Sequence, residues 1–324
     1  MDVEIELAVR DAVQGAARQS VSFPPDRLDE LGWGELLEAD SESAVRAFFE
    51  EQGRLILSSD VLDSVMIAAL GDERFVWPQT QFLFPVPGQT ACSSESGTFR
   101  GLAFGELAES FVVPVERDGV VRLLTITRAE LDIEPVQGID PTAGLVSATG
   151  NATNLEDPGF DADTWATALA AGRRALAHEL VGLSSRMIEL VVEHVSVRHQ
   201  FGKPLGINQA VQHKLADSKV LLEAARALTG ESWETTTTFA ATVAKAQASR
   251  AFDLIAASGQ QLFGAIGYTW EHEWRRYIRR GFLLSVLLGA TDELEREIGE
   301  ALVADGVPRI GGLYRSGEGG TRVP

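Results

Sequence analysis

The stretch RHQFGKPL at residues 198–205 separates two long helical patterns and decides how the C-terminal half of the chain is organised. A cation followed by glycine and proline is a good helix stop. Downstream, a second long helix is expected from about Gln209 to Gly230, and an alanine-rich third over about 233–262. Upstream, apolar side chains recur every three, four or seven residues, as in a long packed helix: Trp165, Leu169, Leu176, Leu180, Leu183, Met187 and Leu190. The pattern predicts an up-and-down helix bundle over residues 159–304.

The sequence on either side of this bundle has a different character. Over residues 71–158, glycine and proline interrupt short β-rich runs, and Asp118-Gly119 between two of these runs is a hairpin signal. A small antiparallel β-domain, either a barrel or a sandwich, is expected there. Residues 1–70 have helical patterns, and residues 305–324 form a glycine- and arginine-containing tail that we expect to be loose. The predicted fold class is therefore α+β, mainly α.

The composition restricts the classes of function. A chain of 324 residues fits two or three packed domains. A net charge of −19 argues against nucleic-acid binding, and any phosphate site must be built locally from a few arginines or lysines. The longest apolar runs, such as residues 282–288, are far shorter than the roughly 20 residues of a membrane span. Cys92 stands alone, and the acidic N-terminus has no signal-peptide pattern, so a cytoplasmic location is expected.

Two segments of the bundle resemble signature motifs of the acyl-CoA dehydrogenase family. The first is residues 198–205, followed by QAVQ at 209–212 and LAD at 215–217. The second is QQLFGAIGY at 260–268, followed by Glu271 and Arg279. Three N-terminal segments resemble the family more weakly: 6–13, 28–33 and 50–54. The resemblance implies a shortened N-terminal helical domain, a middle β-domain, and a C-terminal four-helix bundle through which subunits pair.

The resemblance also implies an FAD cofactor and the residues that would hold it. Arg198 would reach the diphosphate of an FAD held mainly by a neighbouring subunit, because an arginine offers a two-pronged donor to a phosphate. Gln261 would donate to the same diphosphate, and Ala265 stands where the family usually has glycine. The alternative for Arg198 alone is that it only ends a helix. The complete set of cofactor candidates is Arg198, Phe201, Gln209, Gln261, Gly264 and Ala265.

The catalytic base of the family is absent from the two positions that the resemblance gives for it. In the family, a glutamate removes the α-proton of the acyl-CoA while the flavin accepts a hydride from the β-carbon. Counting from the two motifs puts Leu288 and Gly172 at the alternative base positions, and neither can accept a proton. Loss of a general base typically lowers the rate ~10²–10⁴-fold. Arg173 matches a family arginine near the active site, although an ordinary, partly buried arginine is the alternative.

Other carboxylates near these positions are not expected to replace the base. Glu179 and its neighbour His178 lie about two helical turns beyond Gly172, roughly 10 Å away. Asp292 and Glu293 follow Leu288 closely, but a capped and solvated helix start explains them better.

The pattern resembles the shorter, base-less subunit of actinobacterial α2β2 acyl-CoA dehydrogenases that act on steroid side chains. This likeness implies a glutamate-bearing homologue as partner, acyl-CoA bound in the complex, and electron-transfer flavoprotein as acceptor; no metal ion is expected. The substrate class rests on analogy alone. Two alternatives stay open: a self-sufficient acyl-CoA dehydrogenase with a relocated base, and a non-enzymatic interaction protein on the same fold.

Overall fold

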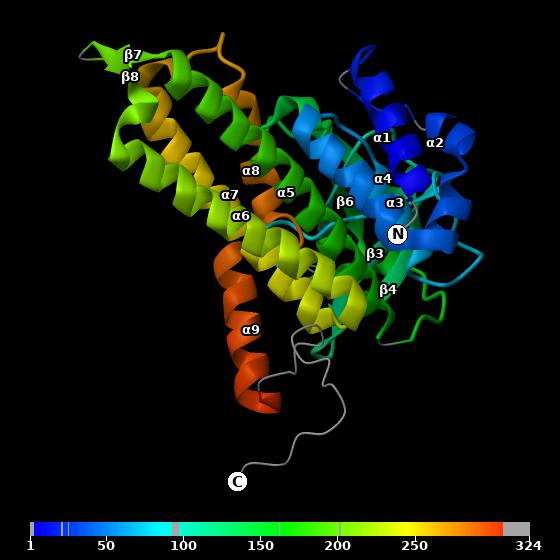
Figure 1. Cartoon of the computed structure of the whole chain (residues 1–324). Coiled ribbons are helices and arrows are strands. Elements are labelled where there is room, and N and C mark those ends of the chain that lie inside the picture. Colours follow the sequence, from blue (N-terminus) through cyan, green and yellow to red (C-terminus); the bar gives the residue numbers. More distant parts are fainter. Residues whose placement is uncertain are drawn as a thin grey trace.

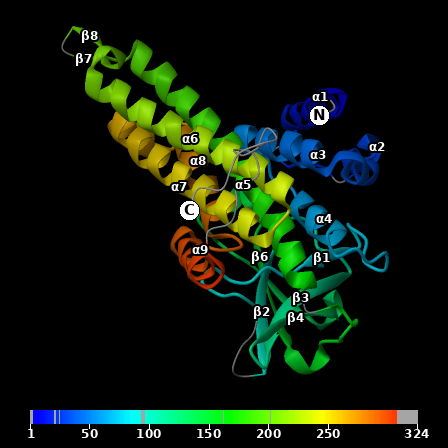
Figure 2. The same ribbon diagram turned by 60° about the horizontal axis from the view of Figure 1, so that its bottom comes forward.

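The computed structural model describes residues 3–20, 22–24, 26–92, 97–161, 163–200 and 202–306. N-terminal helices and a small β-layer lie against a bundle of long helices (Figures 1 and 2). The expected fold class, α+β with mainly helix, is confirmed. The N-terminal helices are α1 (Val3–Ala17), α2 (Asp26–Leu31), α3 (Trp33–Leu55) and α4 (Val61–Ala68).

Between α4 and the bundle, the described residues form two three-stranded sheets, of order β1-β3-β4 and β2-β6-β5. The strands are β1 (Thr80–Phe82), β2 (Thr98–Ala103), β3 (Ser110–Arg117), β4 (Val120–Thr127), β5 (Asp132–Pro135) and β6 (Val146–Asn151). The expected hairpin at Asp118-Gly119 is confirmed, and both of its residues have positive φ, 54° and 76°, as a type I′ turn requires.

The expectation of a wholly antiparallel β-domain is wrong for one strand pair. β1 pairs with β3 in parallel, Thr80 opposite Ser110. A parallel pair needs a long crossover connection, and the chain between these strands provides one because it contains β2, which belongs to the other sheet.

The C-terminal half is the expected helix bundle, and the helix stop at residues 198–205 is confirmed. Its helices are α5 (Thr164–Val197), α6 (Gln209–Thr235), α7 (Thr238–Phe263), α8 (Trp274–Val286) and α9 (Thr291–Asp305). Between α5 and α6 lie a tight hairpin, β7 (His199–Gln200) with β8 (Lys203–Pro204), and the 3-10 turn η4 (Leu205–Ile207). A second 3-10 turn, η5 (Gly264–Tyr268), follows α7.

Helix α6 does not end at Gly230 as expected. It continues to Thr235 and stops where Thr236 adopts a left-handed conformation, φ 53°. A glycine inside a helix costs only about 1 kcal/mol, and the buried neighbours Thr229 and Ser232 hold this turn against the bundle.

Helices α3 and α5 touch through their backbones. A Cβ on Gly182 would lie 1.9 Å from the carbonyl oxygen of Glu50, and one on Gly53 would lie 2.1 Å from that of Glu179. Glycine at these two positions therefore lets the N-terminal helices approach the bundle closely enough to bury polar side chains between them.

None of the described helices is both long and apolar enough to cross a bilayer.

Candidate functional site

The two alternative base positions lie side by side in space. Gly172 is on α5, and Leu288 is in the loop between α8 and α9 with φ 57°. A Cβ on Gly172 would lie 2.6 Å from Cδ1 of Leu288 and 2.7 Å from Sδ of the buried Met66. Two positions counted from separate motifs thus meet at one point, and apolar atoms fill that point.

Arg173 lies beside this point, but its guanidinium is already engaged. Its Nε donates to the carbonyl of Leu288 at 3.0 Å, and Nη1 donates to Oγ1 of Thr242 at 2.7 Å. Glu297 of α9 accepts from both terminal nitrogens at 2.9 Å. Sequence reasoning missed Glu297, since it lies 124 residues from Arg173 and belongs to no recognised motif. The candidate substrate-side arginine instead joins α5, α7 and α9.

A surface pocket of about 340 Å³ opens next to Arg173 and Leu288. The segment Pro85–Thr90 forms one wall. Both arginines of the lining are paired, Arg173 with Glu297 and Arg296 with Glu300, each at 2.9 Å. The pocket therefore presents glutamates, and its described lining holds no unpaired cation for a phosphate.

Glu293 caps a helix, as predicted from its position at the start of the last helix. Its Oε2 accepts from the backbone N–H of Ala290 at 2.9 Å and closes the first turn of α9.

The cofactor candidates gather at the opposite end of the bundle, where α5 ends, α6 begins and α7 ends. Five of them are exposed there: Arg198, Gln209, Gln261, Gly264 and Ala265. Phe201 lies outside the described residues. The helix ends are tied together by aromatic contacts, since the rings of His194 on α5 and Phe263 on α7 lie 4.7 Å apart. In Figure 1 this end carries the β7–β8 hairpin, and the β-sheets and α9 lie at the far end.

Other basic side chains act on His194 at this end. Burial lowers the pKa of His194, and the positive charges of His272 and Arg198 lower it further. No carboxylate among the described residues forms an ion pair with Arg198. Gly264 has φ 62°, and a Cβ there would meet nothing within 4 Å. The turn after α7 thus needs glycine for its backbone and leaves open surface beside an unpaired arginine.

The two groups of candidates are far apart on one helix. Arg173 and Arg198 are separated by 25 positions along α5 and its cap, which at 1.5 Å per residue is about 38 Å. An extended FAD cannot span that distance. An FAD molecule that contacted Arg198 therefore could not also reach Gly172 of the same chain.

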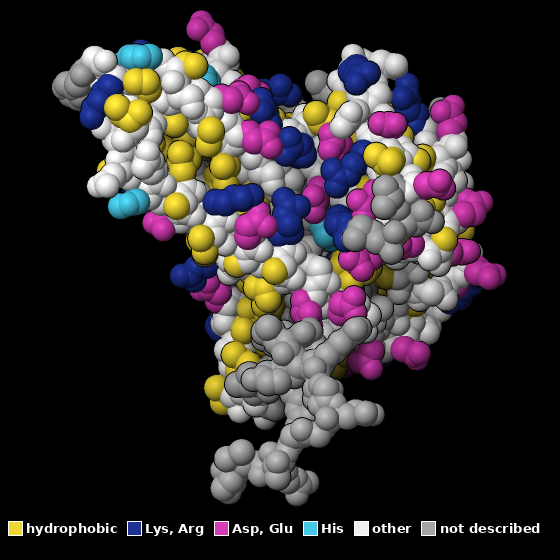
Figure 3. Space-filling model, in the orientation of Figure 1, with side chains coloured by type: hydrophobic (Ala, Val, Ile, Leu, Met, Phe, Trp, Pro, Cys, Tyr) yellow, Lys and Arg dark blue, Asp and Glu magenta, His cyan; other side chains and the backbone are white. Residues whose placement is uncertain are grey.

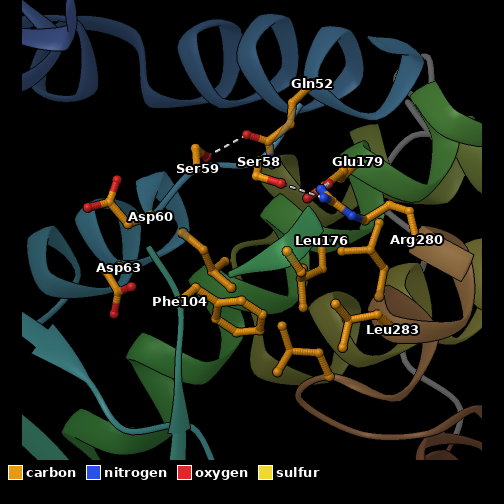
Figure 4. A pocket seen from close by; sticks show the side chains of 14 residues that line it. Gln52, Ser58, Ser59, Asp60, Asp63, Phe104, Leu176, Glu179, Arg280 and Leu283 are labelled. Carbon is orange, nitrogen blue, oxygen red and sulfur yellow. Dashed lines mark hydrogen bonds and ion pairs between the residues drawn. The ribbon is translucent and has the colours of Figure 1, made fainter. Parts of the chain in front are cut away.

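A second cluster, not expected from the sequence, surrounds Arg280 of α8 (Figure 4). Its Nε donates to Asp140 at 2.6 Å, Nη1 to the carbonyl of Leu57 at 2.9 Å, and Nη2 to Oγ of Ser58 at 2.6 Å. Burial opposes ionisation of Asp140, but the charge and hydrogen bond of Arg280 outweigh it and lower the pKa of that carboxyl. This single guanidinium joins the bundle, the β-layer and the N-terminal helices.

Glu179 lies at the edge of this cluster, and one of its two carboxylate oxygens lacks a hydrogen bond. It is 2% exposed, its Oε1 has no hydrogen-bond partner, and Nη1 of Arg280 is 3.5 Å away. Burial raises the pKa of Glu179 to about 7. Across a cavity of about 40 Å³ lies Asp60, whose pKa burial raises to about 6.

The raised pKa of Glu179 predicts that this residue stabilises the fold more in mild acid than at higher pH. A carboxyl whose pKa is raised on folding stabilises the fold below its unfolded pKa of about 4.5 and loses that contribution as pH rises through about 7. Between pH 8 and 6, protonation of Glu179 should add on the order of 1 kcal/mol to the free energy of unfolding.

The measurement is the difference in the free energy of unfolding between the wild type and Glu179→Gln as a function of pH, because other groups titrate in the same pH range. Lys245, with a pKa lowered by burial to about 7, and His194 change stability with the opposite sign. Denaturant unfolding at several pH values should show that the variant loses the acid-side gain. Parallel pH profiles for the two proteins would contradict the assignment.

Comparison with known proteins identifies the class. Residues 158–303 match the family model described as acyl-CoA dehydrogenase, C-terminal domain. The C-terminal domain of the chain therefore belongs to the acyl-CoA dehydrogenase family, and the chain as a whole shares the fold of solved acyl-CoA dehydrogenases. Members of this family bind FAD.

Among curated proteins, the acyl-CoA dehydrogenase IpdE2 of Mycobacterium tuberculosis is 37% identical over 167 residues, which are 51% of this chain and 50% of IpdE2. The chain thus aligns with about half the length of this relative.

Solved structures share the fold over nearly the whole chain. A steroid acyl-CoA dehydrogenase variant, Tcur3481–Tcur3483 G363A, superposes with TM-score 0.71 at 21% identity, over 94% of this chain and 97% of that one. The ChsE4–ChsE5 complex of Mycobacterium tuberculosis gives 0.71 at 18%, over 94% and 97%. A Mycobacterium smegmatis glutaryl-CoA dehydrogenase with bound FADH2 gives 0.72 at 17%, over 94% and 95%.

Proposed function

We propose that this chain is the FAD-binding, non-catalytic subunit of a heteromeric acyl-CoA dehydrogenase, and that a glutamate-bearing homologue supplies the base. The observation that carries the proposal is the separation of about 38 Å between Arg198 and the region of Gly172 and Leu288. The exposed end of the bundle is suited to an FAD whose ring lies in another subunit. The chain's own base position is filled.

FAD is the hydride acceptor of the reaction, and this chain's residues would hold its polar half. Arg198 is exposed and forms no ion pair with a described carboxylate, so it is free to donate to a diphosphate. Gln261 and the backbone of Gly264 and Ala265 would add donors at the same end, with Gln209 and Phe201 near the adenosine.

The filled base position supports a non-catalytic role for this chain alone. A glutamate at position 172 would meet Leu288 and Met66, and Arg173 is held by Glu297. The neighbouring pocket is lined by Glu293, Glu297 and Glu300, which disfavours the phosphates of a CoA ester. We therefore place acyl-CoA in a site of the complex whose base comes from the partner.

The surface near Arg198 is suited to contact with a partner subunit. Hydrophobic side chains are spread over this end of the bundle in Figure 3, and Val197, Ile207 and Val220 are 74%, 53% and 66% exposed. Apolar surface beside a ligand-binding end favours a subunit interface. Two structural neighbours are named as two-component assemblies, Tcur3481–Tcur3483 and ChsE4–ChsE5. By analogy, we extend the proposal to an α2β2 assembly in the cytoplasm, steroid side-chain CoA esters, and electron-transfer flavoprotein as acceptor.

A self-sufficient enzyme with a relocated base is the second candidate, and Glu179 is the carboxyl that favours it. Its pKa of about 7 and an Oε1 without a hydrogen bond are properties of a general base. The cavity beside it, about 40 Å³, is however too small for an acyl chain. If the chain is instead a non-enzymatic interaction protein, its complexes should contain no flavin with any partner.

Replacing Arg198 by alanine should weaken FAD binding about 10- to 100-fold in the complex with the glutamate-bearing homologue. The loss follows from removing a charge-assisted hydrogen bond to a diphosphate, worth about 1.5–3 kcal/mol. Flavin retained after gel filtration, together with titration of released FAD, measures the effect.

Two control variants make this test specific. Lys203→Ala removes a cation from the same hairpin, and Arg122→Ala removes an exposed arginine from β4. Both should keep FAD within about twofold, because neither charge is assigned to the diphosphate. Equal flavin retention by Arg198→Ala and the wild-type complex would exclude the proposed site.

A further inference from the structure

A buried carboxylate oxygen without a hydrogen bond points to a ligand site separate from the flavin. Glu179 lines the cavity of about 40 Å³ drawn in Figure 4, hereafter the inner cavity. It is 98% buried and leaves Oε1 without a hydrogen bond. An unsatisfied buried polar atom is costly, and the inner cavity exceeds the roughly 10–15 Å³ that one water needs.

The local charges favour a neutral ligand beside Glu179. Arg280 is the cation of the inner cavity, and Asp140 already balances it at 2.6 Å. Glu179 shares this cation with Asp140, since Nη1 of Arg280 lies 3.5 Å from its Oε1. Its pKa of about 7 keeps a large protonated fraction at neutral pH. A protonated carboxyl both donates and accepts, which matches the needs of a hydroxyl group.

The inner cavity adjoins a groove on the surface. The two share four lining residues, Ser58, Ser59, Asp60 and Ala143. These residues come from the α3–α4 junction and from the 3-10 turn η2 (Pro141–Ala143). The inner cavity and the groove therefore lie on either side of this rim, and Ala143 stands between them.

The lining of the groove selects for hydroxyl groups and against phosphates. It presents hydroxyl side chains, among them Ser20, Ser22 and Thr142, and the carboxylates of Asp60 and Glu106. No lysine or arginine lines it among the described residues. Hydroxyls and carboxylates can pair with several hydroxyl groups at once, whereas two carboxylates without a cation repel a phosphate ester.

We propose that the groove and the inner cavity together form a binding site for a small neutral polyol, one hydroxyl of which lies against Oε1 of Glu179. The site is independent of the FAD end of the bundle, on different helix ends and with opposite local charge. The ligand class excludes CoA esters and nucleotides.

The test compares glycerol with glycerol 3-phosphate, which has the same carbon skeleton and adds a phosphate. Saturation-transfer NMR on the full chain should detect glycerol and not glycerol 3-phosphate. Glu179→Leu should weaken glycerol binding about three- to tenfold, the worth of one hydrogen bond. Glu179→Gln, which keeps a neutral donor and acceptor, should stay within about twofold.

A second variant keeps the test decisive if Glu179→Leu does not fold. Ala143→Leu places a larger side chain at the rim and should abolish access to Glu179 while leaving that carboxyl intact. Circular dichroism and melting confirm the fold of each variant. The proposal would be overturned if the chain did not bind glycerol, or if glycerol-soaked crystals held only water in the inner cavity. It would also be overturned if glycerol 3-phosphate bound more tightly than glycerol, or if Ala143→Leu bound glycerol as the wild type does.

Discussion

Arg280→Met should lower the free energy of unfolding by about 3–5 kcal/mol. Methionine keeps the length and much of the apolar volume of the side chain, but it leaves Asp140, 7% exposed, without its cation. Removing one member of a buried ion pair typically costs that much, because the other charge stays buried and uncompensated. The carbonyl of Leu57 and the hydroxyl of Ser58 lose their donors as well.

Denaturant unfolding measures the effect, and two further variants separate charge from packing. Arg276→Met changes an exposed arginine of the same helix and should stay within about 0.5 kcal/mol of the wild type. The double variant Arg280→Met/Asp140→Asn should recover part of the loss, since no unpaired charge remains. If Arg280→Met lowers the free energy of unfolding no more than Arg276→Met does, the junction of the bundle, the β-layer and the N-terminal helices does not depend on this guanidinium.

Gly182→Ala should destabilise the chain by about 3 kcal/mol. The added Cβ would lie 1.9 Å from the carbonyl oxygen of Glu50 and 2.6 Å from its Cα, so the backbones of α3 and α5 must move apart. Overpacking in a close-packed core typically costs about 1–3 kcal/mol, and the upper end applies when backbone atoms clash.

Gly230→Ala is the matched control on α6. A Cβ there meets nothing within 4 Å, and alanine is the better helix former by about 0.5–1 kcal/mol. The two substitutions should therefore have opposite signs in thermal unfolding. A neutral Gly182→Ala would show that α3 and α5 are not in backbone contact.

The helix bundle was predictable because its signals are local. The apolar stripe of α5 and the glycine and proline after Arg198 follow from spacing alone, as does the turn at Asp118-Gly119. The parallel pairing of β1 with β3 was not predictable, since it depends on which sheet receives β2.

In the candidate site, too, local signals were predictable and contacts between distant residues were not. Counting residues found Gly172 and Leu288, but only the fold shows that they touch each other and Met66. The partners of Arg280 lie 140 residues away at Asp140 and 222 at Ser58, and no pattern along the chain joins such residues. Roles assigned to Arg198, Gln209, Gln261, Gly264 and Ala265 stay proposals, and their gathering at one exposed end is what the structure adds.

Flavin stoichiometry tests the central proposal most directly. This chain is co-expressed with a glutamate-bearing homologue, purified through a tag on this chain alone, and its flavin is counted against both chains. We expect a yellow complex with about one flavin for every two chains, and this chain alone without flavin or acyl-CoA-dependent reduction of an acceptor. A chain that purifies alone, fully loaded with FAD and active, would contradict the account and move the base to a residue such as Glu179.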